Sequence, residues 1–380
     1  MSTNFTFESH PPTRILLISW RYLGDTLLLT PLLSSLKNAY PHAAIDVLIP
    51  SNNAAVLENN PDIHRVITIA SKPKLGALLR LLLSLFRRYD LAINTQTSDR
   101  PTLCAIVAGR QRVSVVPPRS EAGGWKRWFF DATLEFSLER RHALLGNLRF
   151  CELLGIAPCY RVTPPRSAVG LPMPNARDWL SNDSTAPFSK GEGVNPKYAV
   201  LHVMPQWRYK QWHNEGWVEL GRYLRGLGYR LVLTGSPLPE ERAAIDALLA
   251  QLPDDSLNLA GQLSLGQLTG VIERAGLFIG PDTGITHLAA ATGTLTVAIF
   301  GPTDPQKWGP WPKDYAQGVS PFVPKGSQRV GNVLLIQGVD PRGCMPCQRD
   351  GCEHRRFSHS DCLDGLTARS VIDAIDKILN

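Results

Sequence analysis

Short apolar runs alternate with longer segments of helical periodicity along the first part of the chain. The apolar runs lie at residues 14–19, 45–49, 66–69 and 91–94. Such runs are typical of strands that are buried on both faces of a parallel sheet. Between them, residues 31–40 and 75–86 place leucines on one side of a helix. This alternation predicts βαβ units and a parallel sheet.

The same pattern begins again after residues 181–197, a segment rich in Ser, Pro, Gly and Asn that reads as a linker. The second series of predicted strands lies at residues 198–203, 229–234, 277–279 and 296–300. A chain of 380 residues has room for two domains of ordinary size. We therefore expect an α/β protein with two doubly wound domains, whose ligand cleft lies between them at the carboxyl ends of strands. The expected boundaries are an N-terminal domain at 1–180, the linker at 181–197, a C-terminal domain at 198–365 and a terminal helix at 366–380.

The first residues are polar and lack the basic and then apolar layout of a signal peptide. The longest apolar stretch, Leu75–Phe86, is interrupted by Arg80 and is too short to span a bilayer. The protein is thus expected to stay in the compartment where it is made. Basic residues flank Leu75–Phe86, so the segment suits either a helix that faces the core or one that lies on a membrane, and we favour the first.

Positive charge is concentrated in one region of the sequence. The whole chain has a net charge of +7, whereas Lys72–Arg149 alone holds 14 Lys and Arg against 6 Asp and Glu. Such an excess favours an anionic partner, which includes phosphorylated lipid, a membrane surface or nucleic acid. A basic surface that only contacts solvent is the alternative.

A Gly-Asp pair follows the first predicted strand. Asp25 lies at a turn from strand to helix, where backbone N–H groups face the ligand cleft of such folds. A carboxylate there is a candidate general base for an incoming hydroxyl group. The alternative is a helix cap in which Asp25 accepts hydrogen bonds from the next turn.

A second group of candidate residues lies at 280–287, where a strand ends and a helix begins. Gly280 and Gly284 allow a ligand to approach the backbone, and the free N–H groups of the helix start favour a diphosphate. Asp282 would repel a phosphate, so it is assigned to sugar hydroxyls. His287 falls one turn inside the helix, and a structural histidine is the alternative.

Lys210 and Arg208 follow the first strand of the second series and are candidates to neutralise a diphosphate leaving group. An exposed basic loop is the alternative. The sequence contains no Gly-x-Gly-x-x-Gly and no Walker A motif, which disfavours dinucleotide oxidoreductases and P-loop kinases. It also lacks an Asp-x-Asp pair of the kind that often holds a metal on a sugar diphosphate. Lysine and a helix end would then neutralise the diphosphate, and no cofactor or catalytic metal is expected.

Four cysteines cluster near the end of the chain, at Cys344, Cys347, Cys352 and Cys362. The first pair has the spacing of metal ligands, whereas the other gaps are shorter than in common zinc modules. A structural metal site is therefore the alternative to reduced thiols or an occasional disulfide, and no catalytic role is assigned to these cysteines.

Three segments together resemble the heptosyltransferases of lipopolysaccharide core synthesis, glycosyltransferase family 9. They are RILLISWRYLGDTLLLTPLLSSLKNAYP, VMPQWRYKQWHNEGW and GPDTGITHLAAATGTLTVAIFGPTDPQKWGPW. The resemblance implies the GT-B fold, with two Rossmann-like domains that face each other across a cleft. It implies an ADP-heptose donor, a lipid A–Kdo–heptose acceptor and inversion without a metal. The opening motif leans toward the enzymes that add a branching third heptose.

Family roles are carried over onto matching residues only. The catalytic aspartate falls on Asp25 and the phosphate-binding lysine on Lys210. The donor-binding set is Lys210, Gly235, Asp282, Thr283, Gly284 and His287. In the basic region, Arg119, Lys126 and Arg127 are assigned to the acceptor. The family pattern departs at Pro205 and Gln206, where members often have hydroxyl residues, and this leaves the phosphate contacts open.

The resemblance also implies a cytoplasmic protein in peripheral contact with the inner face of the inner membrane, with no nucleic acid as partner. Two other functions remain open. One is a GT-B transferase that uses another nucleotide sugar or a protein acceptor, because these motifs define the nucleotide diphosphate better than the sugar. The other is a non-catalytic sensor of sugar nucleotides, which would need neither an acid at position 25 nor a basic acceptor surface.

Overall fold

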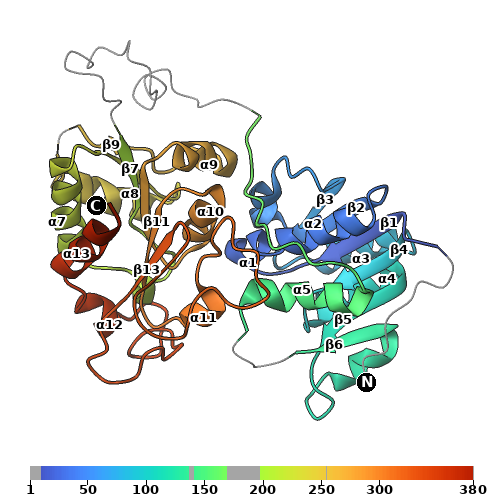
Figure 1. Ribbon diagram of the computed structural model, residues 1–380. Helices are drawn as coiled ribbons and strands as arrows, with labels where there is room; N and C mark the ends of the chain where they lie inside the picture. The colour runs from blue at the N-terminus through green and yellow to red at the C-terminus, as the bar shows by residue number, and fades with distance from the viewer. Residues whose placement is uncertain (1–9, 137–140, 169–196, 254, 380) are drawn as a thin grey trace. The chain divides into compact units, whose positions relative to one another are not determined.

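The computed structural model describes residues 10–136, 141–168, 197–253 and 255–379. Its chain divides into two compact units (Figure 1). The first contains the residues up to Pro165 together with Ala316–Val319, and the second contains Arg166–Tyr315 and the residues from Ser320 onward. The predicted linker at 181–197 lies outside the described residues except for Lys197.

The first unit is built on a six-stranded sheet in the order β3-β2-β1-β4-β5-β6, in which each neighbouring pair is parallel. Its elements are β1 (Arg14–Ile18), α1 (Leu23–Leu27), α2 (Thr30–Ala39), β2 (Ala44–Pro50), η1 (Ser51–Leu57), β3 (Arg65–Ile69), α3 (Leu75–Leu85), β4 (Tyr89–Asn94), α4 (Asp99–Ala108), β5 (Gly109–Val116), η2 (Gly124–Phe129), β6 (Ala132–Glu135) and α5 (Ala143–Leu154). This strand order is that of a Rossmann sheet.

Helices cover both faces of this sheet, which explains the unbroken apolar runs in the sequence. Helices α2 and α5 pack against each other, and so do α3 and α4 (Figure 1). Leu16 and Ile18 of β1 share a core cluster with Leu81 and Leu85 of α3. All four side chains are buried, so the core on this side of the sheet lies between the central strands and the α3–α4 pair.

The second unit repeats this topology. Its sheet has the order β12-β13-β11-β10-β7-β8-β9, and only β12 is antiparallel to its neighbour. Its elements are β7 (Tyr198–His202), η3 (Arg208–Lys210), α7 (Asn214–Gly226), β8 (Arg230–Thr234), α8 (Pro239–Leu249), β9 (Leu257–Asn258), α9 (Leu265–Glu273), β10 (Leu277–Pro281), α10 (Gly284–Thr292), β11 (Thr296–Phe300), α11 (Pro305–Trp308), β12 (Gln328–Val330), β13 (Val333–Gln337), α12 (Asp361–Asp364) and α13 (Ala368–Leu379). Without β12, the strand order is again that of a Rossmann sheet, and two doubly wound halves are confirmed.

The C-terminal helix α13 packs on α7 in the second unit. Val371 and Ile375 of α13 are fully buried in the same cluster as Trp212 and Trp217. The indole N–H of Trp212 donates to the backbone oxygen of Leu366 at 2.7 Å. The end of the chain is therefore bound to the segment that immediately follows Lys210.

Helix α3 corresponds to the predicted helix at 75–86. One side of it faces the core, as expected, but its other side is also apolar and is exposed. Leu81 and Leu85 are buried, whereas Leu75 and Leu83 are 73% and 77% exposed. Among the helices of the described residues, none is long and apolar enough to cross a membrane.

Candidate active site

The two central strands of the second sheet, β7 and β10, bring two predicted site residues together. These strands lie side by side and parallel, although residues 203–276 separate them in sequence. The chain leaves β7 toward β8 on one side of the sheet and leaves β10 toward β11 on the other. Ligands of doubly wound folds bind at this kind of switch point, outside the carboxyl ends of the strands. The loop after β7 carries Lys210, and the loop after β10 carries Asp282.

Lys210 and Asp282 form an ion pair at this point. The Lys210 Nζ lies 2.7 Å from the Asp282 Oδ2, and the Thr303 hydroxyl donates to the same oxygen at 2.6 Å. The Asp282 side chain is only 6% exposed, and that of Lys210 is 21% exposed. Two residues that lie 72 positions apart are thus held together by the fold, with one anionic and one cationic group at the edge of the sheet.

The electrostatic environment keeps Asp282 ionised. Burial by itself would raise the pKa of its carboxyl group, but the ammonium of Lys210 and the hydrogen bonds from Lys210 and Thr303 outweigh burial. The net result is a pKa below the ordinary value for aspartate. A buried carboxylate with a single nearby lysine is a strong acceptor for ligand hydroxyl groups.

Helix α10 begins directly after Asp282, and Thr283 is its N-cap residue. The Thr283 hydroxyl accepts from the Thr286 N–H, and the Thr286 hydroxyl donates to the Pro281 oxygen at 2.5 Å. Gly280 is required by packing, because a Cβ atom there would lie 2.9 Å from both Phe278 and Thr286. The loop is therefore rigid, and the positive end of a nine-residue helix lies beside the ion pair.

His287, in the first turn of α10, is buried beside the ion pair. Its side chain is 6% exposed, and its Nδ1 has no hydrogen-bond partner within the described part of the chain. Burial lowers the pKa of His287 to about 4, against the opposing effect of Asp282. The imidazole is therefore neutral at pH 7, and its Nδ1 is a buried polar atom that lacks a partner within the described residues.

We expect this burial to make the fold sensitive to mild acid. The pKa of His287 is 6.5 in an unfolded chain and about 4 in the folded protein, so only the unfolded state gains a proton between these values. Stability is present above pH 6.5 and decreases as the pH falls toward 4, by on the order of 3 kcal/mol for this residue. Urea unfolding at a series of pH values measures the slope. His287→Asn should make the slope shallower without abolishing it, because burial also lowers the pKa of His202 to about 4. A variant with the wild-type slope would contradict the assignment.

Side chains near the C-terminus support the loop that carries Lys210. The sequence did not indicate this contact. The Arg356 guanidinium stacks on Trp207 at 4.6 Å from the ring centroid. The Ser360 hydroxyl donates to the backbone oxygen of Tyr209 at 2.7 Å. These residues are far from Lys210 in sequence, and only the cysteine segment around them hinted at a role. The cysteine segment thus packs against the loop that presents Lys210.

Gly235, which was assigned to the donor, follows β8. A Cβ atom at this position would lie 2.4 Å from Ile245 and 2.9 Å from the Glu241 carboxylate. Packing against α8 therefore accounts for a glycine here. Its donor role stays a prediction.

Asp25 lies in the first unit, in the third position of the short helix α1. The N-cap residue is Tyr22, so Asp25 does not occupy the cap position that was the alternative reading. Its side chain is 16% exposed and lies 3.8 Å from the Arg21 guanidinium. The Asn53 amide of η1 donates to the Arg21 oxygen and to the Thr26 hydroxyl, which fixes the turn on both sides of Asp25. The turn follows β1, which is central in its sheet and adjacent to β4.

Two of the three predicted acceptor cations already have partners in the fold. The Lys126 ammonium donates to the Thr97 oxygen at 2.6 Å and pairs with Asp99 at 2.5 Å. Arg127 donates to the backbone oxygens of residues 117 and 124 and to the Glu135 carboxylate. Arg119 is exposed. The acceptor role of all three stays a prediction, and Arg119 is the cation that best suits it.

The four clustered cysteines are free thiols that line one small cavity. Burial raises the pKa of Cys362 to about 12, and the neighbouring thiols Cys347 and Cys352 add to this effect. Within the described residues, the potential ligand atoms that lie within 4.8 Å of one another belong to His359, Asp361 and Asp364. The cysteine sulfurs are thus not gathered as tightly as that, and the structural metal stays a prediction.

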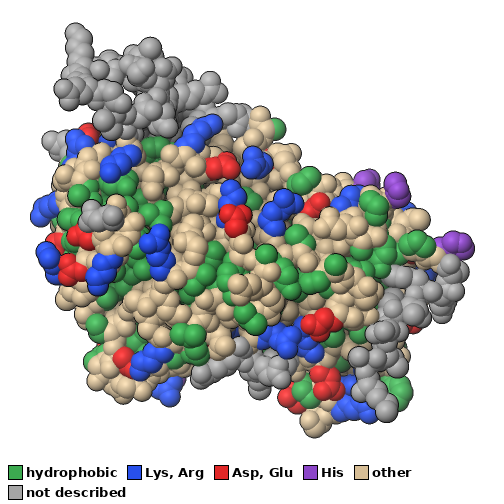
Figure 2. Space-filling view, viewed as in Figure 1, with side chains coloured by type: hydrophobic (Ala, Val, Ile, Leu, Met, Phe, Trp, Pro, Cys, Tyr) green, Lys and Arg blue, Asp and Glu red, His purple; other side chains and the backbone are tan. Residues whose placement is uncertain are grey.

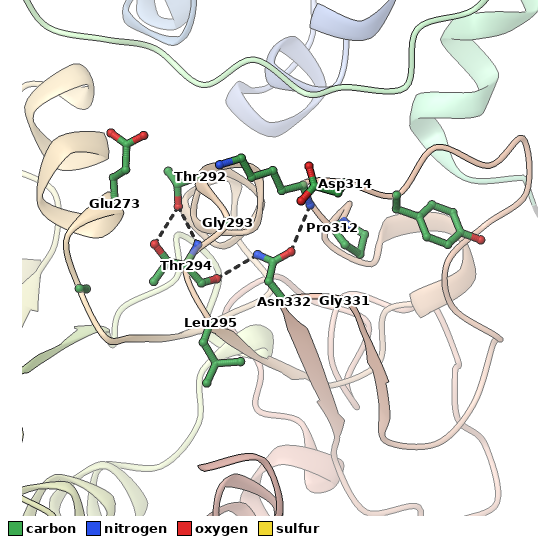
Figure 3. Close-up of a pocket in the computed structure, with 12 residues that line it drawn as sticks. Glu273, Thr292, Gly293, Thr294, Leu295, Pro312, Asp314, Gly331 and Asn332 are labelled. Atoms are coloured by element: carbon green, nitrogen blue, oxygen red, sulfur yellow. Dashed lines mark hydrogen bonds between the residues drawn. The ribbon is translucent and has the colours of Figure 1, made fainter. Parts of the chain in front are cut away.

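A pocket of about 640 Å³ lies at the opposite ends of the strands of this sheet. Figure 3 shows Thr292, Thr294 and Asn332 linked by hydrogen bonds in its wall. Most of its lining comes from the residues that directly precede β10, β11 and β13, and residues 312–315 complete it, so it lies at the amino ends of the strands. The motif residues are at the carboxyl ends, and the pocket is therefore separate from the candidate site.

Two Rossmann-like domains, one of them with a lysine–aspartate pair and a helix start at its switch point, have the architecture of the GT-B class. Residues 78–330 match the model of glycosyltransferase family 9 (heptosyltransferase). The chain belongs to this family and is an enzyme, a glycosyltransferase.

Known relatives agree with this assignment. The chain is 31% identical to lipopolysaccharide heptosyltransferase 3 of Escherichia coli K12 over 306 residues, which cover 78% of this chain and 85% of the relative. A glycosyltransferase family 9 structure from Veillonella parvula has a TM-score of 0.72 at 20% identity and covers 97% of both chains. The structure of E. coli ADP-heptose lps heptosyltransferase II has a TM-score of 0.70 at 20% identity, over 96% of this chain and 98% of that one. The predicted GT-B fold is confirmed.

Proposed function

We propose that this protein transfers L-glycero-D-manno-heptose from ADP-heptose to the inner core of lipopolysaccharide, with inversion and without a catalytic metal. The observation that carries the proposal is the Lys210–Asp282 pair at the switch point of a family 9 glycosyltransferase. The names of the two E. coli relatives support heptose as the sugar, lipopolysaccharide as the acceptor and, for one of them, ADP-heptose as the donor. Similarity to a heptosyltransferase 3 favours the branching third heptose.

The second unit is proposed as the donor domain. Lys210 and the start of α10 bind the diphosphate, because an ammonium and free backbone N–H groups both attract phosphate oxygens. Asp282 accepts hydrogen bonds from the hydroxyl groups of the heptose. The unpartnered Nδ1 of His287 supports this placement, because a buried polar atom without a partner costs free energy until a ligand satisfies it.

The first unit is proposed as the acceptor domain, with Asp25 as general base. Asp25 removes the proton from the acceptor hydroxyl, whose oxygen then attacks the anomeric carbon as the bond to ADP breaks. The departing diphosphate carries the negative charge, which Lys210 stabilises in the role that a metal ion has in other transferases. Direct displacement of this kind inverts the anomeric configuration.

Transfer by the purified protein tests the proposal. A panel of ADP-, GDP- and UDP-sugars is incubated with heptose-containing core oligosaccharide in the presence of EDTA, and the product is analysed by mass spectrometry and NMR. We expect one added heptose, only from ADP-heptose, with inverted anomeric configuration. Transfer from another sugar nucleotide would contradict ADP-heptose as the donor, and loss of turnover with EDTA would contradict metal independence. Absence of transfer with every donor and acceptor would point to a sensor.

Arg119 provides a test of the acceptor domain. We expect Arg119→Gln to raise the KM for the phosphorylated core acceptor several-fold, because an exposed ion pair with phosphate contributes on the order of 1 kcal/mol. Donor KM should stay unchanged. Arg329→Gln, at an exposed arginine of the second unit, is the matched control. A rise in the donor KM with Arg119→Gln would contradict the assignment of this residue to the acceptor.

The proposed location is cytoplasmic, at the inner face of the inner membrane, where the lipid-linked acceptor would be available. Strain analysis provides an independent test. Core oligosaccharide from cells that lack this gene should be one heptose shorter at a defined branch, and an unchanged core would contradict the proposed acceptor.

A further inference from the structure

The first unit exposes a stripe of leucines on helix α3. Leu75, Leu79 and Leu83 are 73%, 50% and 77% exposed, and Phe86, directly after the helix, is 65% exposed. At 3.6 residues per turn, the three leucines fall within an arc of about 80°. The opposite side of the helix packs on the core through Leu81 and Leu85. A surface helix that contacts only water on its outer side does not usually expose a second apolar face there.

A second apolar group lies close by, on η2. Trp125, Trp128 and Phe129 are 60%, 84% and 44% exposed. The buried Lys126 ammonium anchors η2 to the start of α4 through Asp99. Helix α4 packs against α3, and Phe130, which directly follows η2, packs on the same cluster as Leu81. Both apolar groups are therefore attached to the core on the α3–α4 side of the sheet.

The side chains around α3 are positively charged, which favours an anionic binding partner. Residues 72–88 contain five cations and no Asp or Glu. The cations, all exposed, are Lys72, Lys74, Arg80, Arg87 and Arg88. Within the described residues, none of them has a carboxylate within 4 Å, whereas ion pairs such as Arg369–Asp373 lie on the surface of the second unit. Figure 2 shows such positive and negative neighbours at the edge where α7 and α13 lie.

We propose that α3 and η2 form a membrane-docking surface that binds the headgroups of an anionic bilayer. Leucines and tryptophans enter the boundary between headgroups and acyl chains, and the flanking lysines and arginines contact lipid phosphates. Neither group spans the bilayer. Because the proposed acceptor is anchored in lipid, this surface would hold the acceptor domain at its substrate, and to that extent the inference rests on the proposed function.

Vesicle sedimentation of the purified full chain tests this surface without any sugar donor. Vesicles contain either phosphatidylcholine alone or phosphatidylcholine and phosphatidylglycerol in a two-to-one ratio. We expect binding to the mixed vesicles only, with affinity lowered about tenfold by Leu79→Gln/Leu83→Gln, by Trp128→Gln and by Lys72→Gln/Lys74→Gln. Leu227→Gln/Leu238→Gln and Arg242→Gln/Arg329→Gln change exposed residues of the second unit and should bind as wild type does.

Three results would contradict the proposed membrane-docking surface. They are equal binding of the wild type to both vesicle types, unchanged vesicle binding of the α3 and η2 variants, or an equal loss of vesicle binding in the control variants. A wild-type dimer that Leu79→Gln/Leu83→Gln converts to monomer in light scattering, without vesicle binding, would assign α3 to a second copy of the chain. Vesicle binding without heptose transfer would reject the proposed function alone, and transfer without vesicle binding would reject the docking surface alone.

Discussion

Replacing Asp25 with asparagine is expected to lower kcat by about 10²- to 10⁴-fold, the range that a general base contributes. Asparagine has nearly the same shape but cannot accept the proton of the acceptor hydroxyl. The turn should persist, because Asn53 holds it through backbone and side-chain atoms on either side of position 25. Initial rates with saturating donor and acceptor measure the effect.

The binding constants of this variant distinguish a base from a structural residue. ADP affinity should be that of wild type, since the proposed diphosphate site belongs to the other unit. Acceptor KM should change little, because the asparagine amide still forms hydrogen bonds. Glu121→Gln, at an exposed acid of the same unit, should retain full activity. Retained turnover in Asp25→Asn would reject the general base, and a large loss of thermal stability would return Asp25 to a structural role.

Four strands of each sheet were predicted from their short apolar runs, although β13, which is equally apolar and buried, was not among them. Residues 45–49, for example, lie within the buried β2, and residues 229–234 overlap β8. Strand β5 (Gly109–Val116) was missed because it mixes two arginines and a glutamine with its apolar residues. It is paired on both sides, so tertiary context outweighs its local sequence.

The candidate site was predictable in its parts but not in its contacts. Asp282 and Lys210 were each indicated by their position after a strand. Their mutual ion pair depends on β7 and β10 being neighbours, which the sequence pattern alone does not determine. Thr303 was missed for the same reason, although it follows β11, the next strand of the sheet. Helix α3 faces the core through Leu81 and Leu85 as predicted, but helical periodicity does not reveal what covers its outer leucines.

Lys210→Met is expected to weaken ADP binding by about 10- to 100-fold, since charged hydrogen bonds contribute 1.5–3 kcal/mol. Two physical effects combine in this variant. The diphosphate loses a cation, and the Asp282 carboxylate is left buried without its counter-ion. An unpaired buried charge is costly, so the variant should also be less stable. Isothermal titration with ADP, which carries no sugar, measures the first effect without interference from heptose contacts.

Asp282→Asn separates these two effects. If Asp282 contacts only the sugar, this variant should bind ADP as well as wild type or up to several-fold more tightly, because Lys210 is released from its ion pair. Its transfer rate from ADP-heptose should fall. The double variant, Lys210→Met with Asp282→Asn, removes the stray carboxylate and should still bind ADP about tenfold more weakly than Asp282→Asn alone. Lys313→Met, at an exposed lysine beside the pocket at the opposite ends of the strands, should leave ADP affinity unchanged. Equal ADP affinity in the double variant and in Asp282→Asn would mean that Lys210 neutralises Asp282 rather than the diphosphate, and the leaving group would then need another cation.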